Sequence, residues 1–99
     1  MIVRRDLSQS QQAVQGMHAA IEAARQGLIK SDTKHPHLVF CSVSDEFDLV
    51  EYSTKLESKG IRYQVFLEPD IGNKLTAIAT EPIYGSNRKI FRNLKLVGA

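Results

Sequence analysis

The feature that most constrains the fold is the order in which strand-like and helix-like segments alternate along the 99-residue chain. Four short apolar runs predict strands, and two longer runs with apolar residues at three- and four-residue spacing predict helices. The predicted strands are residues 1–5, 37–43, 61–67 and 75–80, and the predicted helices are residues 8–27 and 44–60. A chain of this length has room for one domain, so residues 1–99 are expected to form a single unit.

This order of segments indicates the fold class. Two successive strand–helix–strand units are typical of parallel strands joined by right-handed crossovers. The connection between residues 61–67 and 75–80 is short enough for an antiparallel pair. We therefore predict the α/β class, with a three-layer α/β/α arrangement and a mixed, mostly parallel four-stranded sheet. The tail 88–97 (RKIFRNLKLV) fits either a helical turn or a last strand.

The first predicted helix has two kinds of apolar surface. Ser8 fits an N-cap, and Gln11 three residues later completes a capping-box pattern. The larger apolar residues, expected to face the core, are Val14, Met17, Ile21, Ala24 and Leu28. The small residues beside them, which would let the helix approach a sheet closely, are Gly16, Ala19, Ala20 and Ala23.

A polar stripe runs beside this apolar surface. Its members, Gln11, Gln15, His18 and Glu22, are spaced by four, three and four residues. The stripe follows the carboxyl end of the first strand and Asp6, and ligands of open α/β sheets favour such junctions. One interpretation is a pocket wall in which His18 transfers a proton. The other is structural: Gln15 and His18 satisfy backbone groups, and Gln11 completes the helix cap.

A second candidate site is the loop 68–74 (EPDIGNK) between the last two predicted strands. Its composition is ordinary for a turn, because Asp70 can bond its own backbone two residues on. The functional alternative is that the Asp70 carboxylate, the Lys74 ammonium and the Thr76 hydroxyl together orient a water molecule. The residues alone leave both interpretations open.

The charges are unevenly distributed, although a net charge of +2 does not by itself indicate a nucleic-acid partner. Residues 84–99 contain Arg88, Lys89, Arg92 and Lys95 and no acid. Residues 45–51 contain four acids and no base. The basic tail either contacts phosphates or forms a solvated face.

Metal, redox and membrane chemistry have little support in the sequence. Cys41 is the single cysteine, and its place in the run LVFCSV favours a buried hydrophobe over a nucleophile. His35 and His37 have no third ligand at a telling spacing, so we expect neither a metal nor a cofactor. The start MIVRRDL is too short and too charged for a signal peptide, and no apolar run reaches membrane length. We therefore expect a cytoplasmic protein with no membrane partner.

Several short motifs, in order along nearly the whole chain, resemble the peptidyl-tRNA hydrolase 2 family. The first is R-x-D-L at the end of the first strand, here Arg4, Asp6 and Leu7. The second is A-Q-x-x-H-A on the following helix, here Val14, Gln15, His18 and Ala19. A D-x-G loop, a strand threonine, a proline and a C-terminal L-K-L correspond to Asp70, Gly72, Thr76, Pro82 and residues 94–96.

The resemblance implies hydrolysis, without a metal, of the ester between a peptide and the 3′ end of tRNA, by a protein that is a homodimer. The residues it implies to be catalytic are Asp70, His18, Thr76 and Gln15. Asp70 would orient the water, His18 and Gln15 would shape the pocket and relay a proton, and Thr76 would donate to the substrate. The residues expected to bind the tRNA substrate are Arg4, Asp6, Gln11, Lys74, Arg88 and Arg92.

The sequence also departs from the family pattern. The family has a lysine four residues before the glutamine of the helix motif, and Gln11 occupies that position here. Lys74 replaces a threonine that the family has after the D-x-G loop. Losing a cation that stabilises an oxyanion typically lowers a rate by a factor of about 10² or more. The alternative function is therefore a non-catalytic binding module on the same fold, which binds a nucleotide or a protein partner.

Overall fold

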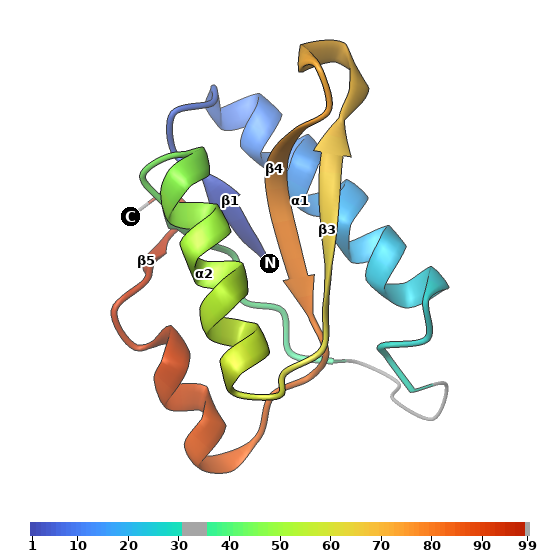
Figure 1. Cartoon of the computed structure of the whole chain (residues 1–99), viewed down its shortest axis with the longest axis vertical. Helices are drawn as coiled ribbons and strands as arrows, with labels where there is room; N and C mark the ends of the chain where they lie inside the picture. Colours follow the sequence, from blue (N-terminus) through green and yellow to red (C-terminus); the bar gives the residue numbers. More distant parts are fainter. Residues whose placement is uncertain (31–35, 99) are drawn as a thin grey trace.

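The computed structural model describes residues 1–30 and 36–98 and contains a five-stranded mixed sheet with helices on both faces (Figure 1). The strands are β1 (Ile2–Arg4), β2 (Cys41–Val43), β3 (Tyr63–Glu68), β4 (Lys74–Thr80) and β5 (Lys95–Leu96). The helices are α1 (Gln9–Arg25), α2 (Glu46–Ser58) and two 3-10 helices, η1 (Pro69–Ile71) and η2 (Gly85–Phe91). The predicted α/β class is confirmed.

The pairing of the strands differs from the prediction. The order across the sheet is β3-β4-β1-β2-β5, and β1–β2 is the one parallel pair of neighbours among the described residues. β4 returns from β3 through η1 and inserts between β3 and β1, antiparallel to both. The mostly parallel four-stranded sheet is therefore wrong in detail. The ambiguous tail forms both a helical turn, η2, and a fifth strand, β5, which pairs with β2.

The two α-helices cover opposite faces of the sheet, because successive residues of a strand point to opposite sides. Ile2 of β1 packs in one core cluster with Leu49 and Leu56 of α2. Val3, the next residue, packs in a second cluster with Ala19 of α1. Figure 1 accordingly shows α2 in front of the sheet and α1 behind it, which gives the layers helix, sheet, helix.

The side of α1 that faces the sheet carries the small residues, as expected for a close approach, and not the larger apolar residues. Of the larger apolar residues only Leu28 is buried, and Met17 and Ile21 are 57% and 55% exposed. The buried residues of the helix are Gln12, Gln15, Gly16, Ala19 and Ala23. Gly16 shows how closely the helix approaches, since a Cβ atom there would lie 2.7 Å from the ring of Phe40. Small and polar residues therefore face the sheet, and the larger apolar residues face outward.

Both α-helices begin at capped residues. Ser8 Oγ accepts a hydrogen bond from the N–H of Gln11, so the predicted N-cap of α1 is confirmed. The N-cap of α2 is Asp45, and its carboxylate accepts from the N–H of Asp48. Within residues 1–30 and 36–98, no helix is long and apolar enough to cross a membrane.

Candidate functional site

A buried hydrogen-bonded network joins α1 to the β3–β4 hairpin, and Gln15 is its centre. Gln15 is 1% exposed, and its Oε1 accepts a 2.7 Å hydrogen bond from the hydroxyl of Thr76, which is fully buried. Gln15 Nε2 donates to Glu68 Oε1 and to Gln11 Oε1, each at 3.2 Å. The network therefore connects the helix motif, the strand threonine and a carboxylate at the end of β3.

Thr76 reaches this network because of a β-bulge. The register shifts between Phe66 and Leu67, whose partners in β4 are Ala77 and Leu75, so Thr76 is an extra residue in β4. Ala77 packs in the core cluster on the α1 side, and Thr76 also bonds to α1. Two successive residues thus point to the same face, and the bulge supplies a hydroxyl beneath α1.

Glu68 is the member of this network that sequence reasoning missed. It is half-buried, ends β3 and lies opposite Lys74, the first residue of β4. A signal was present, because Glu68 continues an alternating strand pattern up to Pro69. The composition of the segment 68–74 instead favours a turn that begins at Glu68. The observed position places one carboxylate and one ammonium opposite each other at the turn end of the hairpin.

His18 and Asp70 flank the network and are both exposed. The ring of His18 stacks on Phe66 of β3, with the ring centroids 4.4 Å apart and the planes at 9°. Asp70 lies in η1, the turn that leads from β3 to β4. Among the hydrogen bonds and ion pairs of the described residues, none joins Asp70 to His18.

On the other side of β4, two charged side chains hold the backbone of Leu75. β1 pairs with β4 through its first two residues, so Leu75 lies beyond the paired region. Arg4 Nη1 donates to the carbonyl oxygen of Leu75 at 3.1 Å, and Glu46 Oε2 accepts from its N–H at 3.0 Å. These bonds satisfy backbone groups that a longer β1 would otherwise pair.

The guanidinium of Arg4 is also held by Asp6. Arg4 Nε and Nη2 donate to the two carboxylate oxygens of Asp6 at 3.0 and 2.8 Å. These hydrogen bonds lower the pKa of Asp6 below its usual value and raise the pKa of Arg4. The side chain of Arg4 is 11% exposed. The two charges are therefore directed at each other, and Arg4 is also directed at β4.

Most of the expected site residues lie around the start of β4, with Gln15 and Thr76 on its α1 side and Arg4 and Asp6 on the other side. They are Arg4, Asp6, Gln11, Gln15, Lys74 and Thr76, with His18 and Asp70 beside them. Arg88 and Arg92 do not join this group. They lie on η2 and at its end, and Figure 1 shows η2 at the opposite end of the molecule from the β3–β4 turn.

The cysteine and the other histidines have less support as functional residues. Cys41 is buried, and burial raises the pKa of its thiol, which supports its interpretation as a hydrophobe. His37 is exposed, and His35 lies outside the described residues. In the described part of the chain, no group of three or more His, Cys, Asp or Glu residues could hold a metal ion.

Comparison with known proteins identifies no relative: no family model matches the chain, and no curated protein matches it. The interpretation of the site therefore depends on its geometry and on the resemblance of its motifs.

Proposed function

We propose that the protein binds the acceptor end of peptidyl-tRNA beside the β3–β4 hairpin and hydrolyses the ester between peptide and tRNA. The observation that supports this is the meeting of residues from three separate motifs at one three-residue segment, 74–76. Arg4 and Gln15 fasten this segment from its two sides, through Leu75 and Thr76. Such a supported segment can hold reacting groups in fixed positions, as ester hydrolysis requires.

In this proposal the buried residues hold the site in position, and the exposed residues carry out the reaction. Gln15 and Thr76 are closed off from solvent, so they act as positioning residues, and Thr76 does not donate to the substrate. His18 and Asp70 are the proposed catalytic residues. Asp70 orients a water molecule, and His18 takes its proton as the water oxygen bonds to the carbonyl carbon of the ester.

The carbonyl oxygen then carries a negative charge, and Lys74 is the cation proposed to stabilise it. Lys74 would replace the lysine that the family pattern has at the position of Gln11. When the bond between the carbonyl carbon and the ribose oxygen breaks, His18 returns its proton to that oxygen. The products are the free peptide acid and the 3′ hydroxyl of the tRNA.

Hydrolysis of an N-acetylaminoacyl-tRNA tests this proposal. Asp70→Asn and His18→Gln should each lower the rate by a factor of about 10² or more, the usual contribution of a general base or a positioned carboxylate. The matched control is Glu57→Gln, an exposed carboxylate on α2 whose amide can still accept from Tyr63. Rates at the uncatalysed level in the wild type would rule out the enzymatic claim.

A non-catalytic binding module is the second candidate, and one observation favours it. Arg4, Gln15 and Thr76 direct their hydrogen bonds at other parts of the protein, which leaves fewer groups for a substrate. Binding of the acceptor end, a nucleotide or a protein partner without any turnover in the same assay would support this module.

The homodimer implied by the resemblance also stays a prediction. Sedimentation equilibrium of the purified chain would show a mass twice that of the 11.1 kDa protomer if it is right.

A further inference from the structure

A shallow groove lies along α2, between this helix and the chain that leads from η2 to β5. It consists of two adjoining hollows with volumes of about 790 and 520 Å³. Both are lined by Tyr52, Lys55, Asn93 and Leu94, so the two hollows lie next to each other. We term it the α2 groove. Neither hollow is lined by Gln15, His18, Asp70 or Thr76, so it is separate from the site described above.

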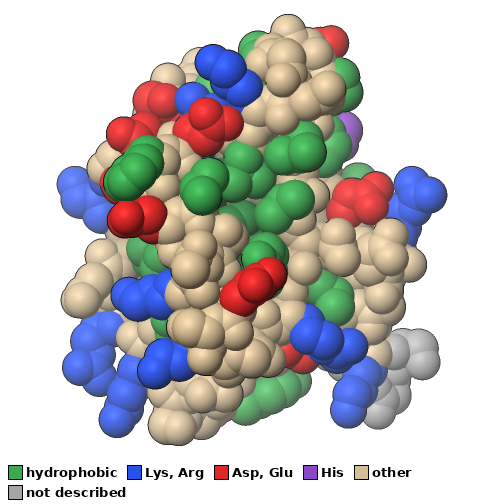
Figure 2. Space-filling model, viewed as in Figure 1, with side chains coloured by type: hydrophobic (Ala, Val, Ile, Leu, Met, Phe, Trp, Pro, Cys, Tyr) green, Lys and Arg blue, Asp and Glu red, His purple; other side chains and the backbone are tan. Residues whose placement is uncertain are grey.

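Basic residues outnumber acidic ones along the α2 groove. Its cations are Arg5, Lys55, Lys59, Lys89 and Lys95, and its acids are Asp48 and Glu51. Both acids line the larger hollow, so the described lining of the smaller one carries positive charge alone. Figure 2 shows Lys and Arg side chains gathered at the lower left, over the region of η2 and the adjoining end of α2.

Arg5, in the larger hollow, is held in a way that suits an anion. Its Nη1 donates to the carbonyl oxygen and to Oγ of Ser42, both at 3.0 Å, and its Nη2 donates to Ser44 Oγ at 3.2 Å. These acceptors fix the guanidinium without neutralising it. In residues 1–30 and 36–98, no carboxylate forms an ion pair with Arg5.

One edge of the Arg5 guanidinium retains hydrogen-bond donors for an anion. Arg4 uses its Nε and Nη2 atoms for bidentate binding of Asp6. In Arg5 the Nε–H has no acceptor among the described residues, and Nη2 uses one of its two hydrogens for Ser44. The same edge of the guanidinium can therefore bind two oxygens of a phosphate.

We propose that the α2 groove binds the phosphates of an RNA backbone, with Arg5 as the bidentate donor and Lys55, Lys59 and Lys89 as point charges. Cations spread over two adjoining hollows suit a chain of phosphates better than a single one. Asn93 can add a hydrogen bond to a further phosphate oxygen. The inference deepens the proposed function and rests on it for the choice of RNA, but binding in the groove does not require ester cleavage.

Fluorescence anisotropy with a labelled oligouridine of about twelve nucleotides tests the groove, since this length covers one single-strand binding surface. The double variant Lys55→Gln, Lys89→Gln should weaken binding by about tenfold or more. The slope of log K against log salt should fall by about 0.7 for each phosphate that the variant no longer neutralises. Arg5→Gln should weaken binding, and Arg5→Lys should restore it only in part, because a lysine keeps the charge without the bidentate edge.

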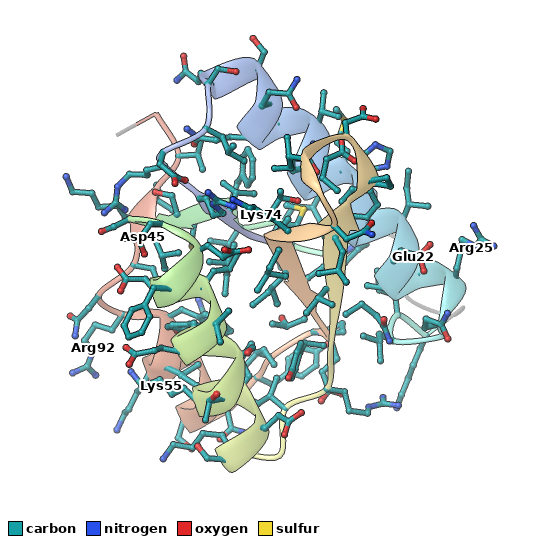
Figure 3. The ribbon with its side chains drawn as sticks, turned by 45° about the horizontal axis from the view of Figure 1, so that its top comes forward. Glu22, Arg25, Asp45, Lys55, Lys74 and Arg92 are labelled. Carbon is teal, nitrogen blue, oxygen red and sulfur yellow. The ribbon has the colours of Figure 1, made fainter. Side chains whose placement is uncertain are left out.

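The matched control is Arg25→Gln, which removes one positive charge on the other side of the molecule from Lys55 and Arg92 (Figure 3). It should change RNA affinity by less than about twofold at moderate salt, since distant surface charges are screened. Equal losses from Arg25→Gln and from Arg5→Gln would indicate attraction by net charge and overturn the groove. Displacement of the oligouridine by equimolar AMP would also overturn it, because a free nucleotide would then be the ligand.

Ester cleavage measured on the same variants separates this inference from the proposed function. If both hold, the groove variants raise KM for charged tRNA and leave kcat unchanged. If neither the wild type nor any variant cleaves the ester, but RNA affinity depends on Arg5 and Lys55, the proposed function fails. RNA binding in the α2 groove is then still supported. If cleavage is normal and oligouridine binding does not respond to the groove substitutions, the proposal that the α2 groove binds RNA is wrong. The proposed catalytic site is then still supported.

Discussion

Arg4 and Arg5 are neighbours in the sequence, but the protein uses their charges differently. Arg4 lies beside β4, where Asp6 occupies its bidentate edge and the carbonyl oxygen of Leu75 takes a third hydrogen bond. Arg5 lies beside β2, is exposed, and is held by neutral oxygens of Ser42 and Ser44. A guanidinium compensated within the protein stabilises the fold. One that is fixed but not compensated is suited to binding an anion from outside.

The largest expected effect follows from replacing Arg4, the arginine whose charge is compensated within the protein. Arg4→Met removes the donor to Leu75 and leaves Glu46 near β4 without its cation. We expect unfolding to become easier by about 2–3 kcal/mol, because a part-buried carbonyl and a carboxylate lose partners. The urea midpoint at constant m measures this. Arg4→Lys should recover part of the loss, and an equal loss from Arg5→Met would contradict the comparison.

A smaller effect is expected from the buried network on the α1 side of the same segment. Thr76→Val keeps the shape of the side chain and removes the hydroxyl that donates to Gln15 Oε1 at 2.7 Å. The amide oxygen then stays buried without this donor, and we expect a loss of about 1–2 kcal/mol in urea unfolding. Thr54→Val on the exposed side of α2 is the matched control and should change stability by less than about 0.5 kcal/mol.

Much of the fold could be predicted, because the local spacing of apolar residues indicates which segments form strands and which form helices. The strand pairing could not, since the place of β4 depends on how the hairpin returns through η1 and inserts beside β1. The small residues of α1 were expected beside a sheet, but the larger apolar residues were wrongly expected to face the core. Met17 and Ile21 have helical core spacing, but Gly16 lets the helix approach Phe40 so closely that small residues fill the contact.

At the candidate site, Gln15 could be selected from the polar stripe beside the apolar one, and Thr76 from its place with Asp70 and Lys74 where two strands meet a loop. Their roles could not be read from the sequence. The partners of Gln15 are side chains, whereas the structural interpretation had expected backbone groups. Glu68 is 53 residues away along the chain, and Thr76 reaches Gln15 through a bulge that is a property of the β3–β4 register. Local patterns carry no information about either.

Lowering the pH sharpens the comparison between the two arginines. Hydrogen bonding to Arg4 lowers the pKa of Asp6 in the folded protein, so the folded state binds fewer protons than the unfolded state. This contribution to stability is complete above the ordinary carboxyl pKa and is lost as the pH falls through the lowered value. Asp6→Asn should therefore flatten the decline of the urea midpoint below about pH 4. Arg5→Met should leave that decline unchanged, and an identical acid profile for wild type and Asp6→Asn would argue against the pair.

The smallest expected effect concerns Arg5 itself. Because Arg5 is exposed and holds no carboxylate among the described residues, Arg5→Met should lower stability by only about 0.5 kcal/mol in the absence of ligand. A ligand that binds only the folded state adds RT ln(1 + [L]/Kd), which is about 0.4 kcal/mol when its concentration equals Kd. Oligouridine at that concentration should raise the urea midpoint of the wild type and of Arg25→Gln, and it should raise that of Arg5→Met less. A loss of several kcal/mol without ligand would mean that Arg5, like Arg4, is part of what holds the sheet together.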